Sequence, residues 1–412
     1  MTTLKGSELA INGGQPVRTK PFPAWPVWDD SDVQAISDAL RSGKWGIGGG
    51  AVERFEQEFA EFQQAKYCTS LVNGTAALEV AIRAVGVEAG DEIIVPPYTF
   101  IATASACLMV NTVPVFVDIE PDTYNLDPTK IEAAITDRTR AIIAVHIAGC
   151  PADMDGIMAV AKKHNLKVIE DAAQAHAAEW RGRRVGAIGD VGTFSFQSSK
   201  NLNSGEGGAT VTNDEQIYQR CWSLQNVGRA RSGKWYEHPL LGWNYRITQF
   251  QGALLSSQLK RVPAQVARRT DNAAYLSERL NEIPGIQPMR VDERVTCHAY
   301  HLYILRYDAS ELGGLPREDF IKAMNAEGIT CSAGYVPLYK ELAFRNPGVY
   351  NAAFKLAGRK MDYDQVSCPV CEKACAEEAI WLYQAWLIGE DHSDMDDIVA
   401  AIAKIRKAAT SG

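Results

Sequence analysis

The segment that decides the fold is TFSFQSSKNLNSGEGG, residues 193–208. Its first residues alternate apolar and polar side chains, with Phe194 and Phe196 on one side, which is the period of a half-buried β-strand. Small polar residues and three glycines follow, and they indicate a loop. Lys200 lies on this loop, just past the predicted strand end. A lysine there is either a nucleophile kept deprotonated by its surroundings or an ordinary solvated side chain.

Upstream of this segment, short apolar runs alternate with helical patterns from residue 67 onward. Such an alternation predicts a mostly parallel sheet that is covered by helices on both faces. Ligands of such sheets bind beyond the C-terminal ends of the strands, so polar groups just after a strand are candidates for one shared site. The strands are expected at residues 68–72, 92–95, 113–117, 141–147, 166–170 and 209–212.

Three polar residues follow one of these strands closely. Asp171 comes directly after the strand VIE, where its carboxylate either meets a ligand or caps a turn. Gln174 and His176 lie a few residues further on and either face the same cavity or are hydrogen-bonded interior side chains.

An anion site and a stacking residue are the other candidates. Gly74 and Thr75 stand at a strand-to-helix junction, where backbone N–H groups and a hydroxyl can hold a phosphate, although NGT is also a simple turn and cap. Ser195 can supply a second phosphate contact. Phe100 follows PPYT, and its ring either lies on a planar ligand or packs in the core.

The composition restricts the class of protein. The 412 residues carry a net charge of −8 with no basic run, which argues against nucleic acid or an anionic membrane as partner. Residues 93–117 carry no charge, but the prolines among them favour a strand, loop, buried helix and strand over a membrane helix. No signal peptide is recognisable at the N-terminus, and the nine cysteines are expected as free thiols without a metal, so a reducing cytoplasm is expected.

We expect three structural units. Residues 1–50 form an extended arm and a helix, residues 51–262 the large domain, and residues 263–412 a smaller αβ domain. Within the small domain, strands are expected at residues 298–307 and 329–335.

The candidate residues form a chemically coherent set. A lysine, a carboxylate at a strand end, a phosphate cradle and an aromatic plate are what pyridoxal 5'-phosphate (PLP) requires of a protein. The lysine forms the Schiff base, the carboxylate keeps the pyridine nitrogen protonated, and the helix end holds the phosphate. Neither a P-loop nor a GxGxxG motif after a strand is present, which disfavours nucleotide enzymes.

Six motifs lie in order along the chain, namely NGTAALE at Asn73, PPYTFIATA at Pro96, VHIAGCPADMD at Val145, EDAAQAHAA at Glu170, FSFQSSKNLNSGEGG at Phe194 and GWNYRIT at Gly242. On these motifs the chain resembles the fold-type I PLP enzymes of the DegT/DnrJ/StrS sugar aminotransferase family over nearly its whole length, from FPAWP at Phe22 to the C-terminal helix. One departure is Ala177-Ala178 after His176, where many relatives carry a glycine; we expect this to alter only packing.

The resemblance implies a role for each matching residue. Lys200 would be the Schiff-base lysine and proton carrier, Asp171 would pair with the pyridinium, and Gln174 would lie near the phenolic oxygen. The phosphate would be held by Gly74, Thr75 and Ser195, and the ring of Phe100 would stack on the cofactor. Asn244 would reach the phosphate of the neighbouring subunit, which implies a homodimer with shared active sites. Arg246 is a further candidate, for a substrate carboxylate.

Three functions remain open at this point. The resemblance implies an aminotransferase that moves an amino group from L-glutamate or L-glutamine to a keto sugar or keto cyclitol. FQSSK, GEGG and the C-terminal CPVCEKACAEEAIWL favour a cyclitol such as scyllo-inosose, and a nucleotide-linked sugar is the alternative. A PLP-dependent dehydratase similar to aminohydroxybenzoate synthase is the second function. A regulator without enzymatic activity is the third, and the presence of both Lys200 and Asp171 argues against it.

Overall fold

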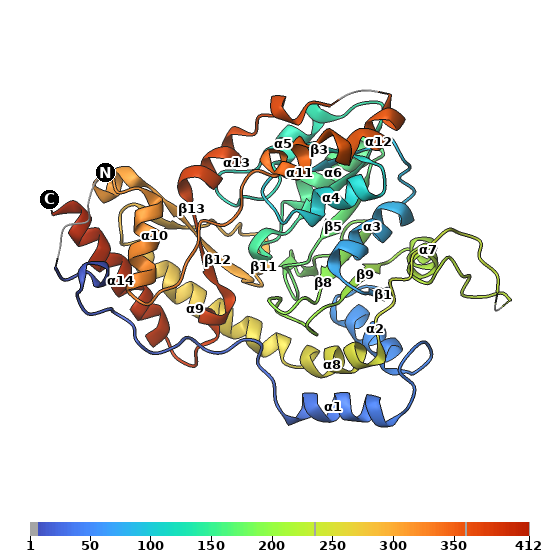
Figure 1. The fold of residues 1–412 in the computed structure, drawn as a ribbon, viewed down its shortest axis with the longest axis horizontal. Helices are drawn as coiled ribbons and strands as arrows, with labels where there is room; N and C mark the ends of the chain where they lie inside the picture. Colours follow the sequence, from blue (N-terminus) through green and yellow to red (C-terminus); the bar gives the residue numbers. More distant parts are fainter. Residues whose placement is uncertain (1–6, 235, 359–360, 412) are drawn as a thin grey trace.

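The computed structural model describes residues 7–234, 236–358 and 361–411, and its larger part is built on a seven-stranded sheet (Figure 1). Neighbouring strands are parallel except around β9, which runs antiparallel to both β1 and β8. The predicted mostly parallel sheet is therefore confirmed. In spatial order the strands are β1 (Tyr67–Leu71), β9 (Gly208–Thr212), β8 (Val191–Ser195), β5 (Lys167–Asp171), β4 (Thr139–Val145), β2 (Glu92–Val95) and β3 (Val113–Phe116).

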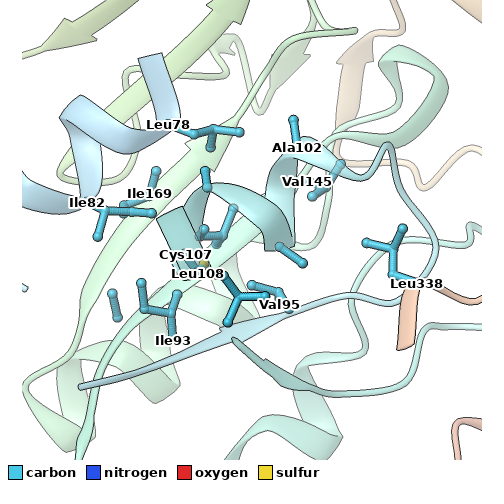
Figure 2. Packing of buried hydrophobic residues seen from close by; sticks show 14 of the residues in the cluster. Leu78, Ile82, Ile93, Val95, Ala102, Cys107, Leu108, Val145, Ile169 and Leu338 are labelled. Atoms are coloured by element: carbon cyan, nitrogen blue, oxygen red, sulfur yellow. The ribbon is translucent and has the colours of Figure 1, made fainter. Parts of the chain in front are cut away.

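Helices cover both faces of this sheet and make three layers. Ile93 and Val95 of β2 point into one apolar cluster, shown in Figure 2, while Ile94 between them points into another. Because successive side chains of a strand alternate in direction, this sheet is buried on both sides. The first layer contains α3 (Gly74–Ala84), α4 (Ala102–Met109) and α7 (Glu215–Gln225), and the second α2 (Ala51–Phe62), α5 (Pro128–Ile131), α6 (Met154–His164) and α8 (Gln249–Leu259).

The uncharged segment, residues 93–117, lies inside these layers. It contains most of β2, then α4 and β3, so the predicted succession of strand, loop, buried helix and strand is confirmed. Within the described residues, every helix is too short or too polar to cross a membrane.

A second, smaller sheet has the order β10-β12-β13 and packs against helices α9, α10 and α14 (Figure 1). The strand predicted at residues 329–335 is wrong, because Ser332 makes only an isolated bridge to Trp381. Gly334 then turns the chain with φ of 80°, and a Cβ there would meet Trp381 Cε2 at 2.4 Å. The elements are α9 (Val262–Leu280), β10 (Ile286–Pro288), β12 (Leu302–Tyr307), α10 (Arg317–Ala326), β13 (Ala379–Tyr383) and α14 (Ser393–Thr410); a three-stranded sheet elsewhere joins β11 (Val295–Cys297), β6 (Glu179–Trp180) and β7 (Arg183–Arg184).

Part of the C-terminal region returns to the large sheet. Phe344, Phe354 and Cys371 are buried in the same apolar cluster as β2 and α4. The predicted domain boundary after residue 262 stays a prediction; α9 begins at that residue. The returning elements are α11 (Leu342–Arg345), α12 (Pro347–Ala357) and α13 (Pro369–Lys373).

The N-terminal arm connects the two parts of the molecule. Leu9 is buried in the apolar cluster of the small sheet, and the chain then runs beside α14 and α9 to α1 (Asp30–Arg41) (Figure 1). Asp29 caps α1 by accepting a hydrogen bond from the backbone N–H of Ser31 at 2.8 Å, and α1 lies against α8. Residues 1–6 of the predicted arm lie outside the described residues.

Candidate active site

A cavity of about 750 Å³ lies beyond the C-terminal ends of β5 and β8, where the sequence pattern predicts a ligand site. Its walls contain seven of the candidate residues, and they come from the start of α3, the segment before α4, the end of β5 with the residues after it, and β8 with the loop that follows it. The seven are Gly74, Thr75, Phe100, Asp171, Gln174, Ser195 and Lys200.

Lys200 is held in this cavity by the backbone of the loop that follows β8. Its N–H donates to the carbonyl of Gln197 at 2.8 Å, and Asn203 Nδ2 donates to its carbonyl at 3.2 Å. Gly205 closes the loop with φ of 84° and accepts from Ser198 N–H at 2.9 Å. Burial lowers the pKa of Lys200 to about 8, and the Asp171 carboxylate opposes this change. A substantial fraction of its amine is therefore neutral and nucleophilic near physiological pH.

Asp171 ends β5 and is oriented by a hydroxyl that the sequence reading missed. Thr103 Oγ1 donates to Asp171 Oδ2 at 2.7 Å, and Thr99 Oγ1 lies 3.0 Å from Thr103 Oγ1. The second carboxylate oxygen accepts only a longer bond, 3.3 Å, from Ala173 N–H. Burial raises the pKa of Asp171, while these hydrogen bonds and the charge of Lys200 lower it. A cation in the cavity would hold this carboxyl ionised.

The start of α3 forms an anion cradle against Ser195. Asn73 Oδ1 accepts from Ala76 N–H at 2.8 Å, and the N–H groups of Gly74 and Thr75 have no partner within the helix. A Cβ built on Gly74 would lie 2.8 Å from Ser195 Cβ, so only glycine leaves this space free. The positive end of the helix dipole and two hydroxyls converge here, which suits a phosphate.

Gln174 and Phe100 complete the predicted wall. Gln174 Oε1 accepts from Ala148 N–H at 2.7 Å, and Gln174 Nε2 donates to the hydroxyl of Tyr335 at 3.1 Å. Hydrogen bonds therefore hold both the oxygen and the nitrogen of this amide in place beside the cavity. Phe100 lines the cavity but is 57% exposed, so its ring is a rim residue that can still cover a flat ligand.

Asn244 and Arg246 lie outside this cavity. Asn244 is exposed and forms an isolated antiparallel β-bridge with Asn226. Arg246 Nη1 donates to Asn226 Oδ1 at 2.8 Å. Arg246 lines a separate cavity of about 220 Å³ that also contains the partly buried side chain of Glu56. Burial raises the pKa of Glu56 to about 7.

His176 also lies outside the cavity. It is fully buried among three phenylalanine rings, and burial lowers its pKa to about 3, so it is a neutral interior side chain. The next residue, Ala177, has φ of 72°. The expectation that alanine here alters only packing is wrong, because a side chain in the left-handed region strains the backbone.

Four further cavity residues come from distant segments and were not identified as site residues from the sequence. Trp25 belongs to the N-terminal arm, His301 precedes β12, and Trp381 lies on β13 and donates through Nε1 to the Tyr98 hydroxyl at 2.9 Å. Tyr335 is the fourth. Thr103 gave a usable signal, because it stands one helical turn after Thr99 in PPYTFIATA. Trp25 and Trp381 lie within FPAWP and CPVCEKACAEEAIWL, but nothing in the local sequence of the four distant residues marks them as cavity residues.

This arrangement fits PLP. A lysine with a lowered pKa, a buried carboxyl in need of a cationic partner and an anion cradle share one cavity, and together they match an aldehyde, a pyridinium nitrogen and a phosphate. Within the described residues, no cluster of His, Cys, Asp and Glu has the geometry of a metal site.

Comparison with known proteins gives one family. The model of the DegT/DnrJ/EryC1/StrS aminotransferase family matches residues 26–383. A protein of Streptoalloteichus tenebrarius, named provisionally as an L-glutamine:3-amino-2,3-dideoxy-scyllo-inosose aminotransferase, is 40% identical over 97% of this chain and 98% of its own length. The L-glutamine:2-deoxy-scyllo-inosose aminotransferase of the same organism is 39% identical over 96% and 97%. The crystal structure of 3-amino-5-hydroxybenzoic acid synthase superposes with a TM-score of 0.85 and 32% identity, covering 94% of this chain and 99% of that one.

Proposed function

This chain belongs to the DegT/DnrJ/EryC1/StrS aminotransferase family, and we propose that it is a PLP-dependent enzyme that moves the amino group of L-glutamine or L-glutamate to the ketone of a cyclitol. The observation that carries this proposal is the meeting of Lys200, Asp171 and the start of α3 in one cavity. The names of the two relatives given above specify a keto cyclitol as acceptor and L-glutamine as donor, the first of them provisionally, which supports the choice of substrates.

Each of the three groups has a distinct task. Bound PLP supplies an electron sink that stabilises negative charge on the carbon bearing the amino group. Asp171, oriented by Thr103, would be the counter-charge that favours a protonated pyridine nitrogen. The N–H groups of Gly74 and Thr75 would hold the phosphate and so position the ring.

Lys200 has two tasks. Its neutral amine would be the group that holds the cofactor covalently, and Nζ, when not so engaged, would hold and move protons. A pKa of about 8 places Nζ where it can both accept a proton from the amine-bearing carbon and return one. With a pKa near that of an ordinary lysine, Nζ would remain protonated and could not act as the base.

The character of the cavity wall supports an uncharged ring as acceptor. Among the described residues that line the cavity, Lys200 is the only lysine or arginine. The remainder includes aromatic rings, Trp25, Tyr335 and Trp381, and neutral amides such as Gln197 and Gln384. A nucleotide-linked sugar brings a diphosphate, which proteins usually hold with arginine, lysine or a metal ion.

A second candidate is the synthesis of an aromatic amino acid. The superposition on 3-amino-5-hydroxybenzoic acid synthase favours it, since that enzyme's fold matches nearly the whole chain. In this reaction PLP-dependent loss of water would make a ring aromatic, and no amino donor would be consumed.

The site is proposed to be completed by a second copy of the chain. Asn244 is exposed and lies outside the cavity of its own subunit, as expected for a residue that reaches the phosphate of the neighbouring subunit. The exposed face of α1 carries Val33, Ile36 and Leu40 at helical spacing, which supports an apolar contact with a partner.

The test is a donor and acceptor assay on the PLP-loaded protein. L-Glutamine should convert the visible band of the bound cofactor to the ultraviolet band of its amine form, and 2-deoxy-scyllo-inosose should reverse this change with formation of an amino cyclitol. A Lys200→Ala variant should fold and bind PLP but give no amino cyclitol. Absence of any spectral change with L-glutamine and L-glutamate would refute the aminotransferase proposal, and release of an aromatic product without a donor would establish the second candidate.

A further inference from the structure

Trp25 lies in the wall of the cavity although it belongs to the N-terminal arm. Its indole Nε1–H donates to the backbone carbonyl of Ser198 at 3.0 Å, close to Lys200 on the same loop. Because this bond satisfies the polar atom of the indole, the flat apolar face of the ring is what remains for a ligand.

The guanidinium of a buried arginine lies over the Trp25 ring. The guanidinium carbon of Arg269 lies 4.9 Å from the centre of the Trp25 ring, and Arg269 Nη2 donates to Gln384 Oε1 at 3.3 Å. Arg269 is fully buried, and its Nε and Nη1 have no hydrogen-bond partner among the described residues. Burial lowers its pKa to about 9, which still leaves it charged at neutral pH. The aromatic face is therefore a principal source of stabilisation for this charge.

The amide of Gln384 extends this support to the lysine loop. Its Nε2 donates to the carbonyl of Ser199, the residue before Lys200. Arg269 thus holds two cavity residues, Trp25 and Gln384, and each of these bonds to the backbone of the lysine loop. The wall that they form is fixed relative to the reacting amine.

The arm is also anchored before Trp25. Arg18 Nη1 forms ion pairs with Asp394 at 2.8 Å and Asp397 at 2.7 Å, and its guanidinium lies 3.8 Å from the centre of the Phe22 ring. Phe22 in turn stacks on Trp386 with 4.7 Å between the ring centres. The arm is thus held before Trp25 by Arg18 and Phe22, and the Trp25 ring itself is held by its contacts with Ser198 and Arg269. Because the ring is already ordered, the entropic cost of binding a ligand falls.

We propose that Trp25 is a specificity-determining residue for the acceptor, with its ring packed on one face of a cyclohexane-type polyol. This inference rests on the proposed aminotransferase function. When the hydroxyl groups of such a ring are equatorial, they point outward, and each face of the ring carries axial C–H bonds. An anchored indole face matches that apolar surface, while the neutral amides of Gln197 and Gln384 are available to the hydroxyl edge.

The experiment compares Trp25→Ala and Trp25→Phe with the wild-type holoenzyme. Trp28→Ala is the matched control, because Trp28 is a neighbour on the arm that is 67% exposed and does not line the cavity. Binding is measured by calorimetric titration with scyllo-inositol, which has the ring but no ketone and therefore cannot react. The two half-reactions are followed separately by stopped-flow absorbance, with L-glutamine as donor and 2-deoxy-scyllo-inosose as acceptor.

Trp25→Ala should weaken scyllo-inositol binding and lower kcat/KM of the acceptor half-reaction by about tenfold, and Trp25→Phe should recover most of both. The L-glutamine half-reaction should fall by a clearly smaller factor than the acceptor half-reaction in the Trp25 variants, and both half-reactions should stay at the wild-type level in Trp28→Ala. Unchanged scyllo-inositol binding in Trp25→Ala, or no binding by the wild type, would overturn the inference. An equal loss in both half-reactions would also overturn it, because Trp25 would then act through Ser198 on Lys200.

The two proposals fail separately. A wild-type enzyme that takes an amino group from L-glutamine but delivers it to no cyclitol contradicts the proposed function. In that case the scyllo-inositol titration still decides whether Trp25 forms a wall for a polyol ring.

Discussion

Replacing Asp171 with asparagine removes the charge that opposes the effect of burial on Lys200. Burial favours the neutral amine and lowers the pKa, whereas the nearby carboxylate favours the ammonium and raises it. Asparagine keeps the shape and can still accept the hydrogen bond from Thr103 Oγ1. The substitution should therefore lower the pKa of Lys200 further.

The size of the change follows from the electrostatics of a partly wet cavity. With a pKa of about 8, roughly one Lys200 amine in ten is neutral at pH 7, against about one in 2,500 for an ordinary lysine. Loss of a single charge interaction on the order of 1–2 kcal/mol corresponds to about one pKa unit. Asp171→Asn should then move the midpoint of Lys200 below its wild-type value, by about one unit.

Competitive labelling of the apoprotein measures this midpoint without any cofactor chemistry. Trace acetic anhydride reacts only with neutral amines, so the yield of the acetylated Lys200 peptide as a function of pH gives its pKa. Lys322 is the internal standard, because its exposed ammonium donates to Asp319 Oδ1 at 2.9 Å and this bond raises its pKa. An Asp319→Asn variant is the matched control, and it should lower the midpoint of Lys322 and leave that of Lys200 unchanged.

Two results would contradict this reasoning. A wild-type midpoint near that of Lys322 would mean that burial does not keep the amine neutral. A midpoint at or above about 8 in Asp171→Asn would mean that the carboxyl is not charged at that pH, and the counter-charge role of Asp171 would fail with it.

Three further predictions concern the cofactor cradle and the backbone. Thr103→Val removes a hydrogen bond to the Asp171 carboxylate, so the Kd for PLP should rise by about ten- to a hundredfold in a fluorescence titration, with Thr103→Ser close to wild type. Gly74→Ala places a Cβ 2.8 Å from Ser195 Cβ, so affinity for PLP should fall by at least about tenfold while affinity for pyridoxal, which lacks the phosphate, hardly changes, and a Ser195→Gly second substitution should restore part of the loss. Ala177→Gly relieves a residue with φ of 72°, so urea denaturation should show a gain of about 0.5–1 kcal/mol, whereas Ala178→Gly, the neighbouring control, should show none.

The residues of the candidate site that could be predicted from the sequence are those at the end of a strand or on the segment that follows it. Asp171 ends β5 and Lys200 lies on the loop after β8, and the rule that parallel strands present ligands at their C-terminal ends brings them together. Gly74 and Thr75 were found by the same rule at the start of a helix. Predicting these residues requires only a local sequence pattern and the expectation of a parallel sheet.

The remainder of the site depends on long-range packing. Trp25, Tyr335 and Trp381 reach the cavity from opposite ends of the chain, and each stands in a local sequence that also suits an ordinary core residue. The strand predicted at residues 329–335 fails for a similar reason. Its alternation of side chains is correct, but the close approach of Trp381 to Gly334 bends the chain after one bridge, and no local pattern reports that contact.

The return of residues beyond 338 to the large sheet has a consequence for synthesis. The apolar cluster that contains β2 and α4 is completed by Phe354 and Cys371, which leave the ribosome long after the strands that they cover. At about 5–20 residues per second, the interval between the two regions is roughly 10–50 s. During that interval the nascent sheet has an uncovered apolar flank, so binding by a chaperone that recognises growing chains should persist until the segment from Phe354 to Cys371 has emerged.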